Sequence, residues 1–303
     1  MCSSAAEGRS VPPVIPLGLR GQDSGTAPVK QRQLVTGRPA FVMGILNITE
    51  DSFWEGSRFT GTQDAVKAAL RMETEGADII DIGGESTRPG SSYVSPDEEM
   101  ERVLPVIEEI RRHSSIPISV DTRKRSVMEA AWRSGADIVN DISALEDDPE
   151  MAPFAAEKGL PVILMHKRGT PDTMQNNVHY TDVVGEVLEY LTERCEFAIS
   201  AGIPRDRIII DPGIGFGKNL AANCALIAGT DRFARIGFPV LMALSRKGCI
   251  GAITGRPPAE RLIGSLSAEL VSVLLGASIV RVHDVRETVD MLAVLQALME
   301  NRS

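Results

Sequence analysis

Eight short apolar runs recur along the chain, and the segments between them have the spacing of amphipathic helices. The runs are FVMGILNI from Phe41, DIIDIGGE from Asp78, IPISVD from Ile116, DIVNDIS from Asp137, PVILMH from Pro161, RIIIDPG from Arg207, PVLMALS from Pro239 and SIVRVHD from Ser278. They are rich in Ile and Val and nearly continuous rather than alternating, which is typical of parallel strands buried on both faces. Strands that alternate with helices predict an α/β fold, either a closed barrel or a doubly wound sheet.

Helical spacing is clearest in three segments, which are DAVKAALRMETEG from Asp64, PDEEMERVLPVIEEIRRH from Pro96 and TDVVGEVLEYLTERCEFAISAG from Thr181. Ser95 precedes Pro96 and is followed three positions later by Glu98. This order predicts an N-cap serine, a proline in the first turn and a capping-box glutamate, so a helix is expected to start at this point.

The positions of polar residues distinguish the two architectures. Polar side chains lie at or just after the end of nearly every run, and these are Asn47, Glu85, Asp121, Asn140, Asp141, His166, Asp211, Ser245 and His283. A doubly wound sheet concentrates such residues at one switch point, whereas a barrel collects them from most strands around one mouth. The pattern therefore predicts a (β/α)8 TIM barrel with its active site at the C-terminal ends of the strands.

A chain of 303 residues is long enough for one such barrel, which typically uses about 250 residues. Residues 1–38 are rich in Ser, Gly, Pro and Gln and have neither helix nor strand periodicity. Such a segment buries too little apolar surface to order itself. We therefore expect a flexible N-terminal extension over residues 1–38 and a single barrel domain over residues 39–300.

Charge and cysteine content narrow the functional classes. The net charge of −9 leaves no broad basic face for a nucleic acid or an anionic membrane, so neither is expected as a partner. The four cysteines are far apart and have no metal-ligand spacing, which argues against a zinc site or a disulfide scaffold. The N-terminus has no signal-peptide pattern. A cytoplasmic protein is expected.

Asp121, Asn140 and Asp211 come from three different strand ends and offer carboxylate and carboxamide edges to one mouth. These groups suit a planar heterocycle that presents adjacent N–H donors. The alternative is that each side chain caps the helix that follows it, as strand-end Asp and Asn often do. Convergence of three such residues favours the binding interpretation.

Basic residues gather late in the chain, in SRK from Ser245 to Lys247 and in RVH from Arg281 to His283. Barrels often bind phosphate with the loops after strands seven and eight, so this cluster indicates a phosphate or pyrophosphate site. Solvated surface charges are the alternative. They are less favoured because RVH lies inside an apolar strand, where an unpaired charge is costly.

The segment DPGIGFGK, from Asp211 to Lys218, has the glycine content of a nucleotide loop but lacks the required spacing, because Pro212 and Asn219 stand where a Walker A loop needs Gly and Ser or Thr. Its glycines are expected to let the backbone approach a ligand and to direct Phe216 toward it. His113 and His179 are expected at the surface. His166 fits a buried core histidine as well as a ligand contact.

These motifs, taken in order, identify a resemblance. The segments MGILNITEDSF, GGESTRPG, ISVDTRKRSV, ADIVNDIS, ILMHKRGTP, IIDPGIGFGK, ALSRKG and VRVHDV resemble the dihydropteroate synthase family over about residues 41–297. The resemblance implies a transferase that joins 6-hydroxymethyl-7,8-dihydropterin diphosphate to p-aminobenzoate, with Mg²⁺ as cofactor and with a homodimer as the common assembly. Sulfonamides, which resemble p-aminobenzoate, compete with it in this family.

The resemblance also implies roles for residues of this chain. The pterin site comprises Asp121, Asn140, Asp211 and Lys247; the diphosphate site comprises Asn47, Arg281 and His283, with Asn47 also near the metal; Thr87, Arg88, Pro89, Phe216 and Gly248 shape the p-aminobenzoate site; Glu55 and Arg88 belong to closing loops. Lys247, Arg281, His283 and Asn47 are the residues expected to act in catalysis.

The chain departs from the usual family pattern in its first loop and after SRK. TEDSFWEGS replaces TPDSFSDGG, so that Glu50, Trp54, Glu55 and Ser57 differ, and Gly248 stands where serine is usual. These changes touch the arylamine side more than the pterin side. Two other interpretations stay open, namely a pterin-binding methyltransferase domain, which has no need of the SRK and RVH cluster, and a catalytically silent pterin-binding relative.

Overall fold

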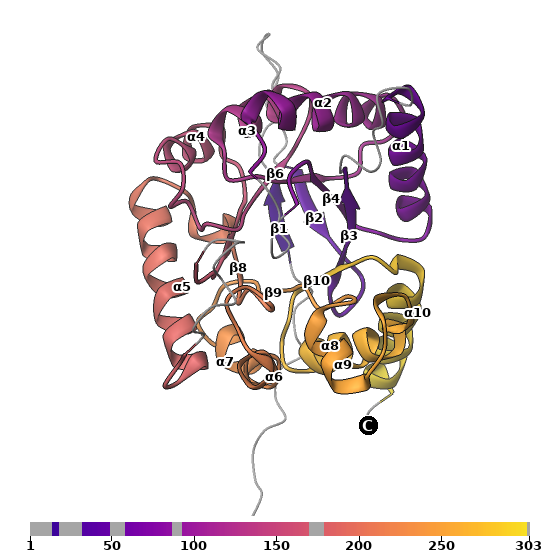
Figure 1. The fold of residues 1–303 in the computed structure, drawn as a ribbon, viewed down its shortest axis with the longest axis vertical. Coiled ribbons are helices and arrows are strands. Elements are labelled where there is room, and N and C mark those ends of the chain that lie inside the picture. Colours follow the sequence, from indigo (N-terminus) through magenta and orange to yellow (C-terminus); the bar gives the residue numbers. More distant parts are fainter. Residues whose placement is uncertain (1–13, 18–31, 49–57, 87–92, 170–178, 302–303) are drawn as a thin grey trace, which may run out of the picture.

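The computed structural model describes residues 14–17, 32–48, 58–86, 93–169 and 179–301, which form an eight-stranded parallel barrel surrounded by helices (Figure 1). The barrel strands are β3 (Phe41–Asn47), β4 (Ile79–Gly83), β5 (Ile118–Asp121), β6 (Ile138–Asp141), β7 (Val162–Met165), β8 (Ile208–Asp211), β9 (Leu241–Met242) and β10 (Ile279–Val282). Their order is β8-β7-β6-β5-β4-β3-β10-β9, and a single bridge between Ile210 and Val240 closes the ring. All eight predicted strands are confirmed.

The helices cover the outside of the ring (Figure 1). They are α1 (Arg58–Thr74), α2 (Pro96–His113), α3 (Arg125–Arg133), α4 (Met151–Lys158), α5 (Val183–Ser200), α6 (Leu220–Ala228), α7 (Thr230–Ala234), α8 (Gly248–Thr254), α9 (Leu262–Leu274) and α10 (Val285–Glu300), with short 3₁₀ turns η2 (Arg205–Arg207) and η3 (Pro258–Glu260). The capping box predicted at Ser95 is present, with the Ser95 side chain accepting from the Glu98 N–H and the Glu98 carboxylate accepting from the Ser95 N–H.

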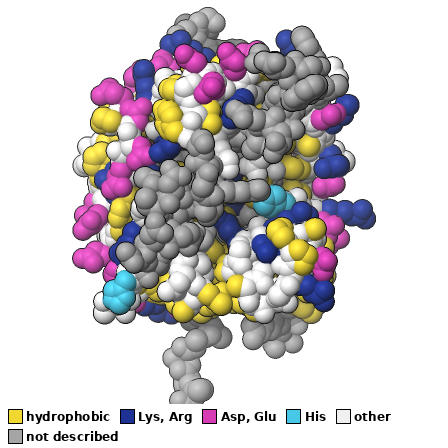
Figure 2. Space-filling view, viewed as in Figure 1, with side chains coloured by type: hydrophobic (Ala, Val, Ile, Leu, Met, Phe, Trp, Pro, Cys, Tyr) yellow, Lys and Arg dark blue, Asp and Glu magenta, His cyan; other side chains and the backbone are white. Residues whose placement is uncertain are grey.

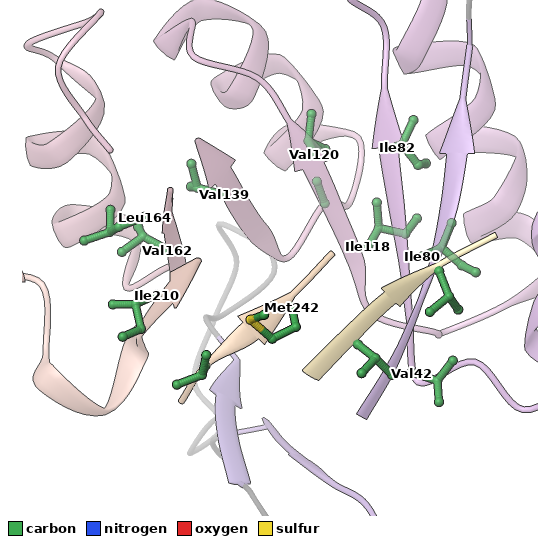
Figure 3. Packing of buried hydrophobic residues seen from close by; sticks show 14 of the residues in the cluster. Val42, Ile80, Ile82, Ile118, Val120, Val139, Val162, Leu164, Ile210 and Met242 are labelled. Carbon is green, nitrogen blue, oxygen red and sulfur yellow. The ribbon is translucent and has the colours of Figure 1, made fainter. Parts of the chain in front are cut away.

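Side chains alternate between two cores along each strand, because successive residues of a strand point to opposite faces. One set faces the helices, and Figure 3 shows members of it, including Val42, Ile80, Ile82, Ile118 and Val120, on neighbouring strands. The other set fills the barrel itself and comprises Phe41, Met43, Ile79, Ile138, Ile163, Ile209, Leu241, Ala243 and Ile279. This inner layer forms the floor beneath the polar residues at the C-terminal ends of the strands.

Two matching ion pairs secure the N-terminal end of the barrel, opposite the polar mouth. Asp78 accepts hydrogen bonds from the Arg38 guanidinium at 2.6 Å and from the Val42 N–H at 2.8 Å. Asp137 accepts from Arg111 at 2.8 Å and from the Ile118 N–H at 3.0 Å. Each aspartate therefore joins the start of its own strand to the strand before it.

The N-terminal segment differs from the sequence-based expectation, because residues 1–38 contain two strands. These are β1 (Val14–Leu17) and β2 (Arg32–Val35), which pair antiparallel. Strand β1 contacts η2, the turn that leads into β8, so the hairpin lies against the N-terminal end of the barrel. The expected N-terminal extension therefore contains two short strands, which pair with each other and contact the barrel at these positions.

Glu269 of α9 is a buried carboxyl group, 1% exposed, whose Oε1 has no hydrogen-bond partner. Burial raises its pKa to about 7 from an ordinary value of 4.5. The folded protein therefore holds a proton that the unfolded chain has released between these pH values, so stability falls as the pH rises from about 5 to about 7.

We expect Glu269→Gln to remove this part of the pH dependence and to exceed the parent in stability at about pH 8 by on the order of 2 kcal/mol. Urea unfolding of the parent and the variant at about pH 5 and about pH 8 measures the difference in stability. Thr192→Gln, at an exposed position of α5, is the control and should leave the pH dependence unchanged. A parent and a Glu269→Gln variant with the same pH dependence would contradict the burial of a protonated carboxyl group.

No helix in the described part of the chain is long and apolar enough to cross a lipid bilayer. Figure 2 shows acidic and basic side chains interspersed around the helical rim of the viewed face.

Candidate active site

The polar residues of the mouth are placed by the same alternation that builds the inner core. Asp81, Asn140, Asp211 and Arg281 each lie two positions after an inward-facing isoleucine, which is Ile79, Ile138, Ile209 and Ile279 respectively. They therefore point into the barrel one layer above the apolar floor. Asp121 pairs in register with Asn140 on the next strand and completes this layer. The structure thus brings together the residues predicted for a polar heterocycle.

Arg281 lies at the centre of this layer. Its Nε and Nη2 both lie 2.6 Å from Oδ2 of Asp81, and Nη2 also donates to Oδ2 of Asp121 at 3.1 Å. The guanidinium is not the unpaired buried charge expected from the sequence, because two carboxylates of the barrel already neutralise it. The cost of an unpaired charge is therefore no evidence for a phosphate ligand here. A role for Arg281 toward an anion stays a prediction that rests on its place at the mouth.

Asn140 has a fixed orientation because its amide nitrogen donates to both carboxylate oxygens of Asp81, each at 3.2 Å. Its amide oxygen is therefore left as an acceptor for a ligand. Burial raises the pKa of the neighbouring Asp121 to about 7, and the charge of Arg281 opposes this rise. N–H donors from a bound heterocycle would favour the charged carboxylate of Asp121.

Asp211 and Lys247 form the opposite side of the mouth. Oδ1 of Asp211 accepts from the Gly213 N–H at 2.7 Å, and burial raises the pKa of this carboxyl group. Lys247 donates to the Ile214 carbonyl at 2.9 Å, and its Nζ lies 4.7 Å from the centre of the Phe216 ring. Burial lowers the pKa of Lys247 to about 8, while the charge of Asp211 opposes the shift. A cation, a carboxylate and an aromatic face therefore meet here.

His283 and Asn47 lie at the edge of the same mouth. The His283 N–H donates to Oγ of Ser245 at 3.2 Å, and Nδ1 of His283 lies 3.2 Å from the same hydroxyl. Asn47 is exposed at the end of β3. A Cβ placed at Gly83 would lie 3.8 Å from the Asn47 amide oxygen and 4.0 Å from Oδ2 of Asp121, so this amide and this carboxylate flank Gly83.

The turn that carries Lys247 is held by its neighbours. Arg246 has a positive φ of 57° and forms a bidentate ion pair with Asp284, at 2.5 and 3.0 Å. Arg261 donates to the carbonyls of Arg246 and Lys247 at 3.0 and 3.4 Å. Gly248 is exposed, and a Cβ added to it would meet no atom within 4 Å. The space for a serine side chain is therefore present at Gly248.

Several predicted site residues lie outside the described residues. These are Glu55, Thr87, Arg88 and Pro89, together with the variant loop position Trp54. Their assignments to loop closure and to the arylamine site stay predictions. The predicted metal residue, Asn47, lies within the described part of the chain, which contains no cluster of three or more His, Cys, Asp or Glu side chains able to hold a metal ion.

Two buried polar residues of this region were missed by the sequence analysis. Asp81 is fully buried and contacts both Arg281 and Asn140. Asp81 could have been found from the sequence, because it is a charged residue inside the apolar run DIIDIGGE, just as Arg281 is inside the run SIVRVHD. Lys218 is 2% exposed and donates to Nδ1 of His166 at 2.9 Å. His166 is likewise buried, 4% exposed, and its ring nitrogen contacts Lys218.

The sequence matches the pterin binding enzyme family over residues 43–283, which span the barrel from β3 to the end of β10. The dihydropteroate synthase of Escherichia coli K12 is 46% identical over 258 residues, covering 85% of this chain and 91% of the relative. The chain belongs to the dihydropteroate synthase family. The dihydropteroate synthase of Neisseria meningitidis serogroup B is 49% identical over 263 residues, covering 85% and 92%.

Solved structures of dihydropteroate synthases have the same fold. The Xanthomonas albilineans enzyme with 4-aminobenzoic acid has a TM-score of 0.82 and 47% identity, covering 88% of this chain and 96% of its own. The Yersinia pestis enzyme in a sulfonamide drug complex has a TM-score of 0.83 and 40% identity, covering 89% and 97%. Both members of the family align over nearly their whole length, so the barrel is a shared feature.

Proposed function

We propose that this chain is a dihydropteroate synthase, which joins 6-hydroxymethyl-7,8-dihydropterin diphosphate to p-aminobenzoate and releases pyrophosphate. One observation carries the proposal: the acceptors Asp121, Asn140 and Asp211 lie at one barrel mouth together with the cations of Lys247 and Arg281. A methyltransferase domain that binds pterin needs the acceptors but has no diphosphate to meet with cations. Membership of the dihydropteroate synthase family supports the same choice.

In the proposed reaction, the bond between the pterin methylene carbon and the diphosphate oxygen breaks, and the arylamine nitrogen forms the new bond to that carbon. The amine then loses a proton, which passes to solvent. Asp121, Asn140 and Asp211 hold the ring through acceptors, while Arg281 and His283 stabilise the negative charge that develops on the leaving diphosphate. The protein therefore acts by orientation and electrostatics, without a covalent intermediate on a side chain.

Magnesium is proposed as the cofactor, with Asn47 as its protein ligand. The exposed amide oxygen of Asn47 suits a hard cation, and Mg²⁺ is commonly held by one or two protein oxygens together with substrate phosphates. A site with few protein ligands therefore fits an ion that arrives with the diphosphate. When bound, Mg²⁺ would supply additional charge neutralisation to the leaving group.

The p-aminobenzoate site is proposed beside Phe216 and Gly248, with Thr87, Arg88 and Pro89 contributed by the segment after Ser86. The half-buried Phe216 ring offers an aromatic face next to Lys247. Gly248 lacks the hydroxyl that is usual in the family, and its open surroundings leave room for a water molecule in that place. Binding of sulfonamides is proposed at this same site, and the chain is proposed to act in the cytoplasm.

A direct assay tests the function. Purified protein with synthetic pterin diphosphate, p-aminobenzoate and Mg²⁺ should form dihydropteroate and pyrophosphate in equal amounts, and chelation of the metal should stop the reaction. Folate-dependent growth of a strain that lacks dihydropteroate synthase should be relieved by the gene for this chain. Pterin binding without turnover would favour a silent relative, and methyl transfer in place of condensation would favour the methyltransferase alternative.

A homodimer is proposed through the outer face of α9 and α10. Apolar side chains are exposed on this face, with Val294 at 61%, Leu298 at 68% and Leu274 at 59%. They surround a cavity of about 690 Å³ between the two helices. A contiguous apolar surface of this kind marks an interaction site, and the same patch on a second copy can cover it about a twofold axis.

Leu298→Glu is expected to convert the dimer to a monomer, because it places a charge within the proposed apolar interface. Light scattering after size-exclusion chromatography should show the mass fall by half. Thr192→Glu, which adds the same charge at an exposed position on α5, should leave the mass unchanged. A dimer that survives Leu298→Glu together with Val294→Glu would place the interface elsewhere.

A further inference from the structure

Lys218 is a buried lysine at the end of the loop that follows β8, and burial lowers its pKa to about 7. Its Nζ lies 2.8 Å from the Gly213 carbonyl oxygen, 3.0 Å from that of Phe216, 3.3 Å from that of His166 and 2.9 Å from Nδ1 of His166. An ammonium group has three hydrogens to donate, so these four acceptors account for all of them. Lys218 has no donor left for a substrate.

A lysine side chain is rarely buried to this depth. No carboxylate of the described residues lies within ion-pair distance of Lys218, whereas a methionine of similar length would fill the same space without loss of hydration. Backbone carbonyls take the place of a counter-ion. The contacts therefore indicate that Lys218 serves the shape of the loop rather than the stability of the core.

The loop backbone is shaped to direct its carbonyls at the ammonium group. Gly213, Gly215 and Gly217 have positive φ angles of 70°, 90° and 65°, which favour glycine. A Cβ at Gly213 would overlap the His166 carbonyl oxygen, so the loop lies directly against the segment after β7. Lys218 joins these two segments, because it binds carbonyls of both.

The same loop also contacts residues that line the mouth of the barrel. The Gly213 N–H binds the Asp211 carboxylate, the Ile214 carbonyl binds Lys247, and the Phe216 ring lies beside the Lys247 ammonium group. A shift of the Phe216 peptide would move the ring that the proposed arylamine site uses. Asp121 and Asn140 come from other strands and would stay in place.

We propose that Lys218 is a positioning residue, which fixes the Gly213–Gly217 backbone through the carbonyls of Gly213 and Phe216, ties it to the His166 carbonyl, and thereby places the Phe216 ring against the arylamine substrate. The inference rests on the proposed function. Lys218 should therefore affect the affinity for the arylamine. It should have little effect on the affinity for the pterin diphosphate, because two of the three proposed ring acceptors, Asp121 and Asn140, lie outside the loop.

Lys218→Met tests the proposal by steady-state kinetics. We expect the KM for p-aminobenzoate to rise about tenfold, which corresponds to about 1.4 kcal/mol. The KM for the pterin diphosphate and kcat should change by less than about threefold, because Asp121, Asn140 and Arg281 lie on other strands and keep their contacts. Lys67→Met, at a lysine of α1 with 73% of its side chain exposed, is the control and should change neither constant.

A double-mutant cycle shows whether Lys218 acts through Phe216. In a Phe216→Ala background, Lys218→Met should raise the KM for p-aminobenzoate by less than about twofold, because the group that it positions is absent. If the two effects multiply, or if Lys218→Met raises both KM values equally, the proposal is overturned. A wild-type chain that forms no dihydropteroate would instead refute the proposed function itself.

Tyr180→Phe provides a second route if Lys218→Met does not fold. The hydroxyl of the half-buried Tyr180 donates to the Gly217 carbonyl at 2.9 Å. Loss of this hydroxyl removes one hydrogen bond that holds the residue next to Phe216. The KM for p-aminobenzoate should rise about two- to threefold, as expected for one hydrogen bond, with the melting temperature almost unchanged. An unchanged KM in this variant would also overturn the proposal.

Discussion

Arg281→Met is expected to lower the free energy of unfolding by about 3 to 5 kcal/mol, the usual effect of removing one partner of a buried ion pair. Asp81 is fully buried and Asp121 nearly so, and both would lose the cation that neutralises them. We also expect kcat/KM to fall at least about a hundredfold, because the proposed diphosphate contact is lost with the guanidinium. Urea unfolding and the dihydropteroate assay measure the two effects.

The double variant Asp81→Asn with Arg281→Met separates the two effects. It removes the fully buried carboxylate together with the cation, so part of the stability should return, while activity should stay low. Recovery of activity along with stability would mean that Arg281 serves only to neutralise Asp81. Unchanged pyrophosphate binding in the folded double variant would likewise contradict a diphosphate site at Arg281.

Lys124→Met should also lower the free energy of unfolding by about 3 kcal/mol or more. The Lys124 ammonium group bridges Oε2 of Glu85 at 2.7 Å and Oε2 of Glu99 at 2.5 Å. Burial already raises the pKa of Glu99, and loss of the lysine would leave this carboxyl group without its cation. Glu85 would retain Arg123, which donates to it at 3.0 Å.

Lys167→Met is the matched control for this prediction. Lys167 donates to Asp147 at 2.9 Å, but Asp147 also accepts from Arg123 at 2.9 Å and is 32% exposed. Loss of the Lys167 ammonium group should therefore lower the free energy of unfolding by less than about 1 kcal/mol. Adding Glu99→Gln to Lys124→Met should recover part of the stability. Equal losses for Lys124→Met and Lys167→Met would show that burial does not strengthen the Lys124 contacts.

The barrel was predictable because each strand carries two independent signals. The Ile- and Val-rich runs marked all eight strands, and the polar residue at the end of most runs indicated a closed ring rather than an open sheet. Helix starts were less regular, since α1 begins at Arg58, before the periodic segment from Asp64. Strands β1 and β2 could not be predicted, because Val14–Leu17 and Arg32–Val35 depend on contacts with each other and with the barrel.

The site was predictable where a side chain alone carries the chemistry. Asp121, Asn140 and Asp211 were recognisable from their places at strand ends. The pairing of Arg281 with Asp81 was not, because it joins residues that are 200 positions apart in the sequence. Lys218 was missed for a different reason, since its acceptors are backbone carbonyls, which leave no signal in side-chain identities.

The closure of the ring has a consequence for the order in which the barrel loosens. Strands β8 and β9 are joined by the single bridge between Ile210 and Val240, and β9 itself spans only Leu241–Met242. Local opening begins where a sheet has the fewest backbone hydrogen bonds. We therefore expect the barrel to open locally between β8 and β9 before it opens elsewhere. The loop that carries Lys218 follows β8, and the loop that carries Lys247 follows β9. Separation of these two strands would therefore displace Lys218 and Lys247 before the other residues of the mouth.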